Sequence, residues 1–177
     1  MIDNAFPLID YGFGTEANGT VSRRNNIYVN ASVMELNEIN ISFRLYNNAG
    51  LYNETTFTNK QRTINWTNLQ DGTYHYNVTV VDTAGNLNTT ATRTITLDTT
   101  PPSFSNFVES PANNTSYIPG QLYWFNATVT EDSINKVGIE FNGVNYTQIT
   151  NQSDVYIFNI LNLAAGNYNY YWWANDT

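Results

Sequence analysis

The sequence has few of the residues on which catalytic and metal-binding chemistry depends. It contains no cysteine, one histidine and only 7 Lys+Arg against 15 Asp+Glu in 177 residues, with a net charge of −8. The absence of cysteine excludes disulfides and thiol chemistry. The single histidine, His75, lies between two tyrosines in an alternating segment that points it to solvent, and alone it supplies neither a Ser-His-Asp arrangement nor a zinc site. We therefore expect no enzyme and no cofactor.

Basic residues and long apolar runs are also missing. Arg23–Arg24 is the only adjacent basic pair, whereas nucleic-acid binding requires a basic stripe. No run approaches the roughly 18 apolar residues that span a bilayer, and the first four residues are unlike a secretory signal. The sequence predicts no nucleic-acid partner and no membrane insertion by this segment.

What the sequence does contain is an internal repeat at a spacing of about 95 residues. Two segments of the first copy return in the second, Ile27–Val33 as Tyr123–Val129 and Leu69–Tyr76 as Leu163–Tyr170. Matches in the same order at a nearly constant offset predict two domains, at residues 1–98 and 99–177.

Within each repeat, apolar and polar residues alternate with a period of two, as in short strands that bury one face in a sandwich. The alternation places Ile39 with Ile41 on an inner face. Two core clusters are expected: Val29, Phe43, Trp66 and Val78 in the first repeat, and Phe125, Ile139, Phe158 and Trp172 in the second.

Turn residues agree with this interpretation. Asn142-Gly143 predicts a type I′ hairpin turn, in which both central residues have positive φ. The phrase Leu-x-x-Gly-x-Tyr ends at Tyr74 and Tyr168, where a tyrosine hydroxyl commonly closes the corner of a sandwich by bonding to nearby backbone.

The run Asp-Gly-Thr-Tyr-x-Tyr-x-Val-x-Val-x-Asp-x-Ala-Gly-Asn at 71–86 precedes a Thr-rich strand and Asp-Thr-Thr-Pro-Pro at 98–102. This pattern resembles the immunoglobulin-like and fibronectin type III-like repeats of prokaryotic, particularly archaeal, cell-surface proteins. The resemblance implies an all-β chain of two tandem Ig-like antiparallel β-sandwiches. It also implies an extracellular or cell-surface location, in stalks, adhesins, surface layers or filaments.

The second repeat has no counterpart of residues 88–98, so we expect it to lack its own last strand. The edge of the strand over 168–174 should then be bare, and a bare edge attracts another strand. The alternatives are a longer array of repeats or a strand donated by another copy, for which 5–11 is a candidate. The partners expected are other copies or neighbouring repeats, and the prolines of 98–102 predict a stiff linker.

Asn-x-Ser/Thr sequons begin at 13 positions, many more than random placement would give. Dense N-glycosylation in a secreted protein explains them, although Asn/Thr alternation on exposed strands also generates sequons. The candidates expected on the solvent face are Asn30, Asn40, Asn65, Asn77 and Asn126.

Acidic residues near the linkers raise the question of calcium, which takes six to eight oxygen ligands. They are Glu16, Asp82, Asp98, Glu109, Glu131 and Asp132. No EF-hand spacing is present, and solvated charges beside turns explain them equally well.

Outward aromatic residues are the remaining candidates for a contact surface. The alternation exposes Trp124, Tyr171 and Trp173, which are expected on two different sheets. Aromatic faces stack on sugars, but they also cover contacts with a neighbouring domain or subunit. The sequence thus predicts a non-catalytic structural module of an extracellular surface protein, with a carbohydrate- or surface-binding adhesin module as the alternative.

Overall fold

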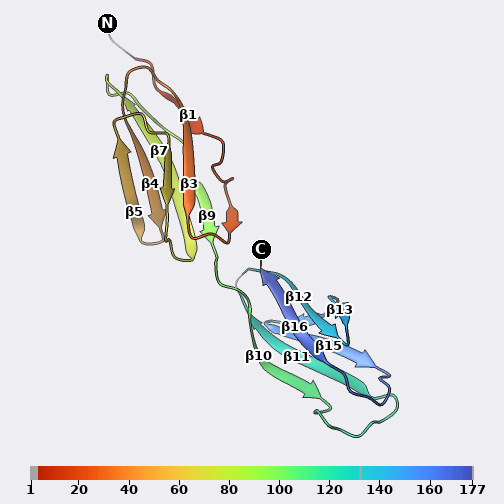
Figure 1. Ribbon diagram of the computed structural model, residues 1–177. Coiled ribbons are helices and arrows are strands. Elements are labelled where there is room, and N and C mark those ends of the chain that lie inside the picture. Colours follow the sequence, from red (N-terminus) through yellow and green to blue (C-terminus); the bar gives the residue numbers. More distant parts are fainter. Residues whose placement is uncertain (1–3, 132, 177) are drawn as a thin grey trace. The chain divides into compact units, whose positions relative to one another are not determined.

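The structure is a computed structural model that describes residues 4–131 and 133–176. Every regular element in these residues is a strand, so the fold is all-β (Figure 1). No helix able to cross a membrane occurs in the described residues. The chain divides into two compact units, residues 1–99 and 100–177, next to the boundary expected at 98/99.

The first unit is a sandwich of two sheets. One sheet has the order β1 (Leu8–Tyr11), β3 (Ile27–Met34) and β6 (Thr63–Trp66). The other has the order β2 (Thr20–Ser22), β9 (Arg93–Leu97), β7 (Gly72–Asp82), β4 (Glu38–Asn47) and β5 (Gly50–Phe57), with β8 (Leu87–Thr89) also on β7. Strands β2 and β9 are parallel. The expectation of a purely antiparallel sandwich is therefore wrong at this pair, because residues 12–19 carry the chain from one sheet to the other and β2 then runs in the direction of β9.

The predicted core of the first unit is confirmed. Val29, Phe43 and Val78 are fully buried and Trp66 is 8% exposed, all within one cluster. Ile39 is the exception, since it is 48% exposed. The pairing of β4 with β7 shifts between Glu38 and Asn40, and a bulge of this kind reverses the face on which a side chain lies.

The corner tyrosines behave as predicted in both units. The Tyr74 hydroxyl donates to the Gln70 carbonyl at 3.1 Å, and the Tyr168 hydroxyl donates to the Ala164 carbonyl at 3.0 Å. The hairpin turn is confirmed too, because Asn142 and Gly143 have φ values of 51° and 81°. These turns fix where the strands of each sandwich begin.

The second unit also has two sheets. One has the order β10 (Ser103–Ser110), β11 (Leu122–Thr130), β15 (Val155–Leu161) and β14 (Thr150–Gln152). The other has the order β13 (Val144–Tyr146), β12 (Ile134–Phe141) and β16 (Tyr170–Asp176). The predicted cluster of Phe125, Ile139, Phe158 and Trp172 forms its core.

Strand β16 lies at an edge. It pairs with β12, and no other described strand pairs with it. The segment suggested as a donor for this edge, residues 5–11, is occupied elsewhere, so that suggestion is wrong. Within it, β1 pairs with β3 of its own unit, and Ile9 and Tyr11 pack against the first core.

The core position of Trp66 yields a stability prediction. Its ring is buried and its Nε1 donates to Asn53 Oδ1 at 3.0 Å, so Trp66→Ala removes packing and leaves a cavity. We expect a loss of about 3–5 kcal/mol in the unfolding free energy of the first unit, measured by urea titration. Leu51→Ala, at a side chain of the same unit that is 55% exposed, is the control, with a change of about 0.5 kcal/mol or less. Equal effects would contradict the assignment.

Candidate functional site

No group of three or more His, Cys, Asp or Glu suited to a metal ion occurs in the described part of the chain. His75 is half-buried on β7, and its Nδ1 is 2.9 Å from Thr94 Oγ1 on β9. This histidine therefore joins two strands of a sheet.

The described acidic residues considered for calcium lie on separate parts of the chain, and two of them have clear partners. Glu16 pairs with Arg24, and Glu109 accepts a hydrogen bond from the Tyr170 hydroxyl at 2.6 Å. Asp132 lies outside the described residues. Calcium binding stays a hypothesis for which the described acidic residues supply no converging set of ligands.

Asp82 has a structural role at the end of β7. Its Oδ1 accepts hydrogen bonds from the backbone N–H groups of Ala84 and Asn86 at 2.9 and 2.8 Å, and its Oδ2 accepts one from Asn86 Nδ2 at 2.8 Å. Burial alone would raise the pKa of this carboxyl, but the hydrogen bonds from Asn86, Ala84 and Gly85 together hold the pKa below its usual value. The ionised carboxylate stabilises the turn that leads into β8.

The three aromatic candidates lie on two sheets. Trp124 is 46% exposed on β11, whereas Tyr171, 54% exposed, and Trp173 lie on β16. The Trp173 ring covers Gly138 so closely that a Cβ there would lie 2.3 Å from it, and its Nε1 donates to Asn145 Oδ1 at 3.0 Å. The Tyr171 hydroxyl donates to Glu140, a bond that raises the pKa of the tyrosine. Both β16 side chains are thus held against their own sheet.

The candidate asparagines differ in how free their side chains are. Asn65 is exposed, and its Oδ1 accepts from Asn26 Nδ2 at 2.9 Å. Asn30 and Asn77 are half-buried, and their Nδ2 groups donate to the Phe13 carbonyl at 3.0 Å and to Thr92 Oγ1 at 3.2 Å. Asn40 and Asn126 are also half-buried. A sugar attached to the Nδ2 of Asn30 or Asn77 would have to break the hydrogen bond that this nitrogen donates.

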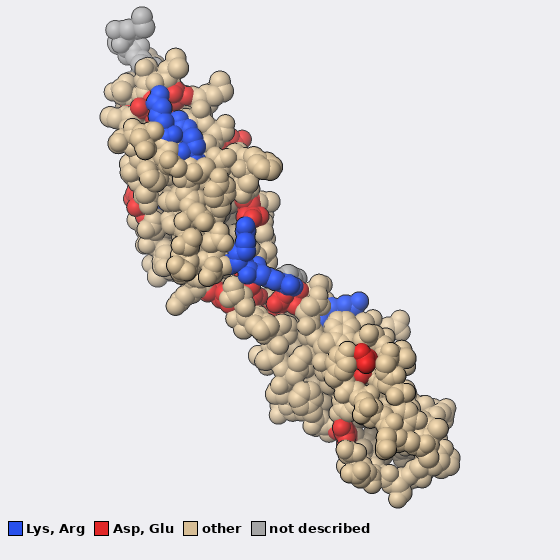
Figure 2. Space-filling model, in the orientation of Figure 1, with Lys and Arg blue, Asp and Glu red and all other residues tan. Residues whose placement is uncertain are grey.

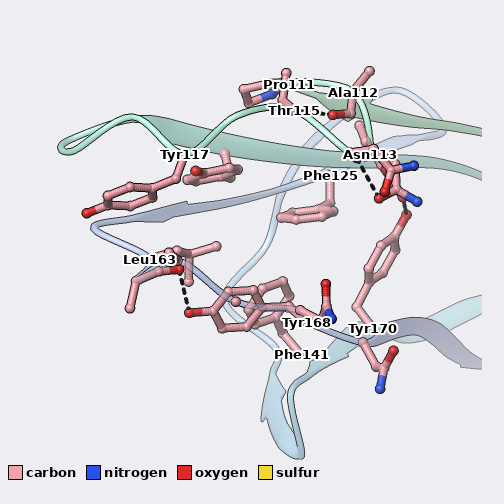
Figure 3. Close-up of a pocket in the computed structure, with 18 residues that line it drawn as sticks. Pro111, Ala112, Asn113, Thr115, Tyr117, Phe125, Phe141, Leu163, Tyr168 and Tyr170 are labelled. Carbon is pink, nitrogen blue, oxygen red and sulfur yellow. Dashed lines mark hydrogen bonds between the residues drawn. The ribbon is translucent and has the colours of Figure 1, made fainter.

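Sequence reasoning did not predict a groove that the second unit contains. A groove of about 750 Å³ runs between Tyr168–Tyr170 and residues 113–117, with Phe125 and Phe141 among its lining residues (Figure 3). We call it the edge groove. The side-chain rings of Phe125 and Tyr170 lie 4.7 Å apart by centroid, and Asn113, Asn167 and Asn169 are also among the lining residues.

One ionisable pair lies at the edge groove. Burial, and then the hydrogen bond to the Glu109 carboxylate, raise the pKa of the Tyr170 hydroxyl above its ordinary value. The tyrosine therefore stays protonated and donates to Glu109. The arrangement supplies an acidic group beside an aromatic floor, which suits a ligand with one positive charge and apolar groups.

The comparisons with known proteins agree with the fold. Residues 15–99 match a sequence family described as "Bacterial Ig-like domain". No curated protein matches the sequence.

Three solved structures illustrate the structural likeness. The fibronectin(III)-like modules of CbhA from Clostridium thermocellum have 16% identity and a TM-score of 0.43, over 96% of this chain and 86% of that one. The amphioxus IgVJ-C2 molecule has 9% identity and a TM-score of 0.44, over 89% and 100%. A 1.5-MDa bacterial ice-binding adhesin has 14% identity and a TM-score of 0.36, over 98% and 65%. At TM-scores below 0.5 these likenesses carry no argument about function.

The family match, the two corner tyrosines and the all-β sheets agree with one another. Both units are all-β sandwiches, and residues 15–99 match the bacterial Ig-like domain.

Proposed function

We propose that this chain is a non-catalytic structural module of an extracellular surface protein, a segment of a stalk, surface layer or filament that transmits tension along the polypeptide. The observation that carries the proposal is the parallel pairing of β2 with β9 in the first unit, with Thr20 opposite Ile95 and Ser22 opposite Leu97.

Parallel strands near the two ends of a domain resist pulling. Tension on the chain enters the first unit before β2 and leaves it after β9, so it pulls the two strands in opposite directions along their length. Their hydrogen bonds are then loaded together in shear. Backbone bonds at both ends of the pair, Gly19 N–H to the Thr94 carbonyl at 2.8 Å and Asp98 N–H to the Ser22 carbonyl at 2.9 Å, add to the ladder.

Side chains also connect the segment before β2 to β9. Asn18 Oδ1 accepts from the Thr94 N–H at 2.7 Å, and Arg93 Nη1 donates to the Glu16 carbonyl at 2.6 Å. The Arg93 guanidinium also lies 4.1 Å from the centroid of the Tyr11 ring, a favourable cation–π contact. These contacts tie the segment before β2 to β9.

An extracellular location is supported by the bacterial Ig-like match over residues 15–99 and by the many sequons. The surface charge is consistent with it, since basic side chains are few on the face in Figure 2. The proposed partners are other copies or neighbouring repeats of the same protein, with glycans on its asparagines.

The alternative is a carbohydrate- or surface-binding adhesin module, which the exposure of Trp124 and Tyr171 favours. The two residues lie on different sheets of the second unit, so they offer two separate aromatic faces. The packing of Trp173 over Gly138 favours the structural role.

Single-molecule force spectroscopy tests the proposal. Pulled from its ends, the full chain should show a force peak that releases on the order of 300 Å as the first unit unfolds. Arg93→Ala should lower that force because it frees the segment before β2. Arg44→Ala is the matched control: Arg44 pairs with Glu54 at 2.8 Å and donates to Thr79 at 2.8 Å, all on β4, β5 and β7. If the two variants lower the force equally, or if the first unit yields without a peak, the proposal is wrong.

Peptide mapping of the protein from its natural source tests the glycans. If sugars are added to the folded chain, Asn65 should be modified to a greater extent than Asn30 and Asn77, whose Nδ2 groups are already hydrogen-bonded. Unmodified peptides at all five candidates would mean that the sequons are a by-product of composition.

A glycan array separates the two functions. A structural module should give no sugar signal that depends on Trp124 or Trp173, so wild type, Trp124→Ala and Trp173→Ala should look alike. A specific signal lost in either variant would favour the adhesin.

A further inference from the structure

The two units share a scaffold but differ on one side of it. Strands β7 and β16 follow the same corner, with Tyr74 and Tyr168 at equivalent positions, and pair with β4 and β12. On its other side, β7 pairs with β9 from Gly72 to Tyr76. In the described part of the second unit no strand takes the place of β9.

The edge groove occupies that place. By the repeat correspondence, residues 72–76, which pair with β9, match residues 166–170, and every one of these five lines the groove. On the opposite wall lie residues 113–115 and Tyr117, which correspond to the region of β2, the parallel neighbour of β9. The groove therefore lies between the counterparts of the two strands that hold β9.

The apolar residues that β9 helps to cover are less buried in the second unit. Tyr76 is fully buried, Tyr74 is 5% exposed and Leu69 is 6% exposed. Their counterparts Tyr170, Tyr168 and Leu163 line the edge groove (Figure 3) and are only partly buried. In the first unit Ile95 and Leu97 of β9 complete this core, with exposures of 0% and 1%.

The charged residues beside the groove indicate what kind of segment would fit there. Opposite Tyr76, β9 places Arg93, whose guanidinium reaches the Glu16 carbonyl. Opposite the counterpart Tyr170, the second unit offers the Glu109 carboxylate, 2.6 Å from the tyrosine hydroxyl. Lys136, the only basic residue between 100 and 177, lies on β12 and does not line the groove.

We propose that the edge groove binds an extended β-strand segment of the β9 type, one with a basic residue followed by apolar residues two and four positions later. The segment pairs antiparallel with residues 168–170 and runs beside residues 113–117. Its apolar side chains cover the partly buried Leu163 and Tyr168, and its basic side chain pairs with Glu109. Strand addition of this kind takes affinity from backbone hydrogen bonds and specificity from alternate side chains. The proposal does not depend on the tension-bearing role of the first unit.

A peptide tests the groove directly. A fluorescent peptide with the sequence of residues 91–98, Ala-Thr-Arg-Thr-Ile-Thr-Leu-Asp, is titrated against the full chain and followed by anisotropy. We expect saturable binding. A peptide with Asp in place of the isoleucine and leucine should not bind, because its charged side chains would face the aromatic floor.

The chain variant Glu109→Gln locates the site in the second unit. It keeps an acceptor for the Tyr170 hydroxyl and should weaken binding of the arginine peptide by about tenfold, the loss of one charge-assisted contact. A peptide with Gln in place of its Arg should bind wild type and Glu109→Gln equally. Absence of binding, or binding that ignores Glu109 and the apolar positions, overturns the proposal.

A fusion of the peptide to the chain covers the case in which the second unit is too unstable to bind a free peptide. The same eight residues are joined to the end of the full chain by a flexible Gly/Ser linker. The linked strand should raise the melting temperature of the second unit, whereas a linked scrambled sequence should not. Equal melting temperatures for the two fusions would overturn the proposal.

Discussion

Strand β9 joins three parts of the first unit at once. Its backbone pairs with β7 on one side and β2 on the other, its Ile95 and Leu97 enter the core, and its Arg93 holds the segment that precedes β2. A sheet edge left open exposes unpaired N–H and C=O groups, and in a sandwich it also uncovers the inner side chains next to it. The burial of Tyr76, the proposed resistance to shear and the contrast between the two units all depend on this single strand.

The two units share the same corner structure although the residues around it differ. The corner bond from tyrosine to the carbonyl four residues earlier occurs at Tyr74 and at Tyr168. The inner residues next to it have diverged. The first unit packs mainly aliphatic side chains there, whereas the second brings the rings of Phe125, Phe141 and Tyr170 together. Aromatic rings bury a large area each, and they form an apolar floor that a small number of side chains suffices to cover.

The cores and corners were predictable because a period of two assigns every residue of a strand once one residue is placed. That rule failed at Ile39, where a bulge breaks the period, and it gave no warning that β2 would run parallel to β9, since Thr20–Ser22 is short and its partner lies far along the chain. Alternation put Asn30 and Asn77 on a solvent face, but both are half-buried, and it could not reveal the hydrogen bonds that occupy their amide nitrogens. The walls of the edge groove come from segments more than forty residues apart, so only the folded chain brings them together.

The scarcity of lysine and arginine has a consequence for resistance to proteases. A protease that cuts after basic residues needs a flexible, extended stretch of chain in its active site. In the second unit the only such residue, Lys136, lies within β12, which is paired with β16 along its length. In the first unit Arg44 and Arg93 lie within paired strands, which leaves Arg23, Arg24, Lys60 and Arg62 outside the strands. Trypsin-like digestion of the native protein is thereby confined to a few short loops of one unit, and the other offers no accessible cleavage site of that specificity.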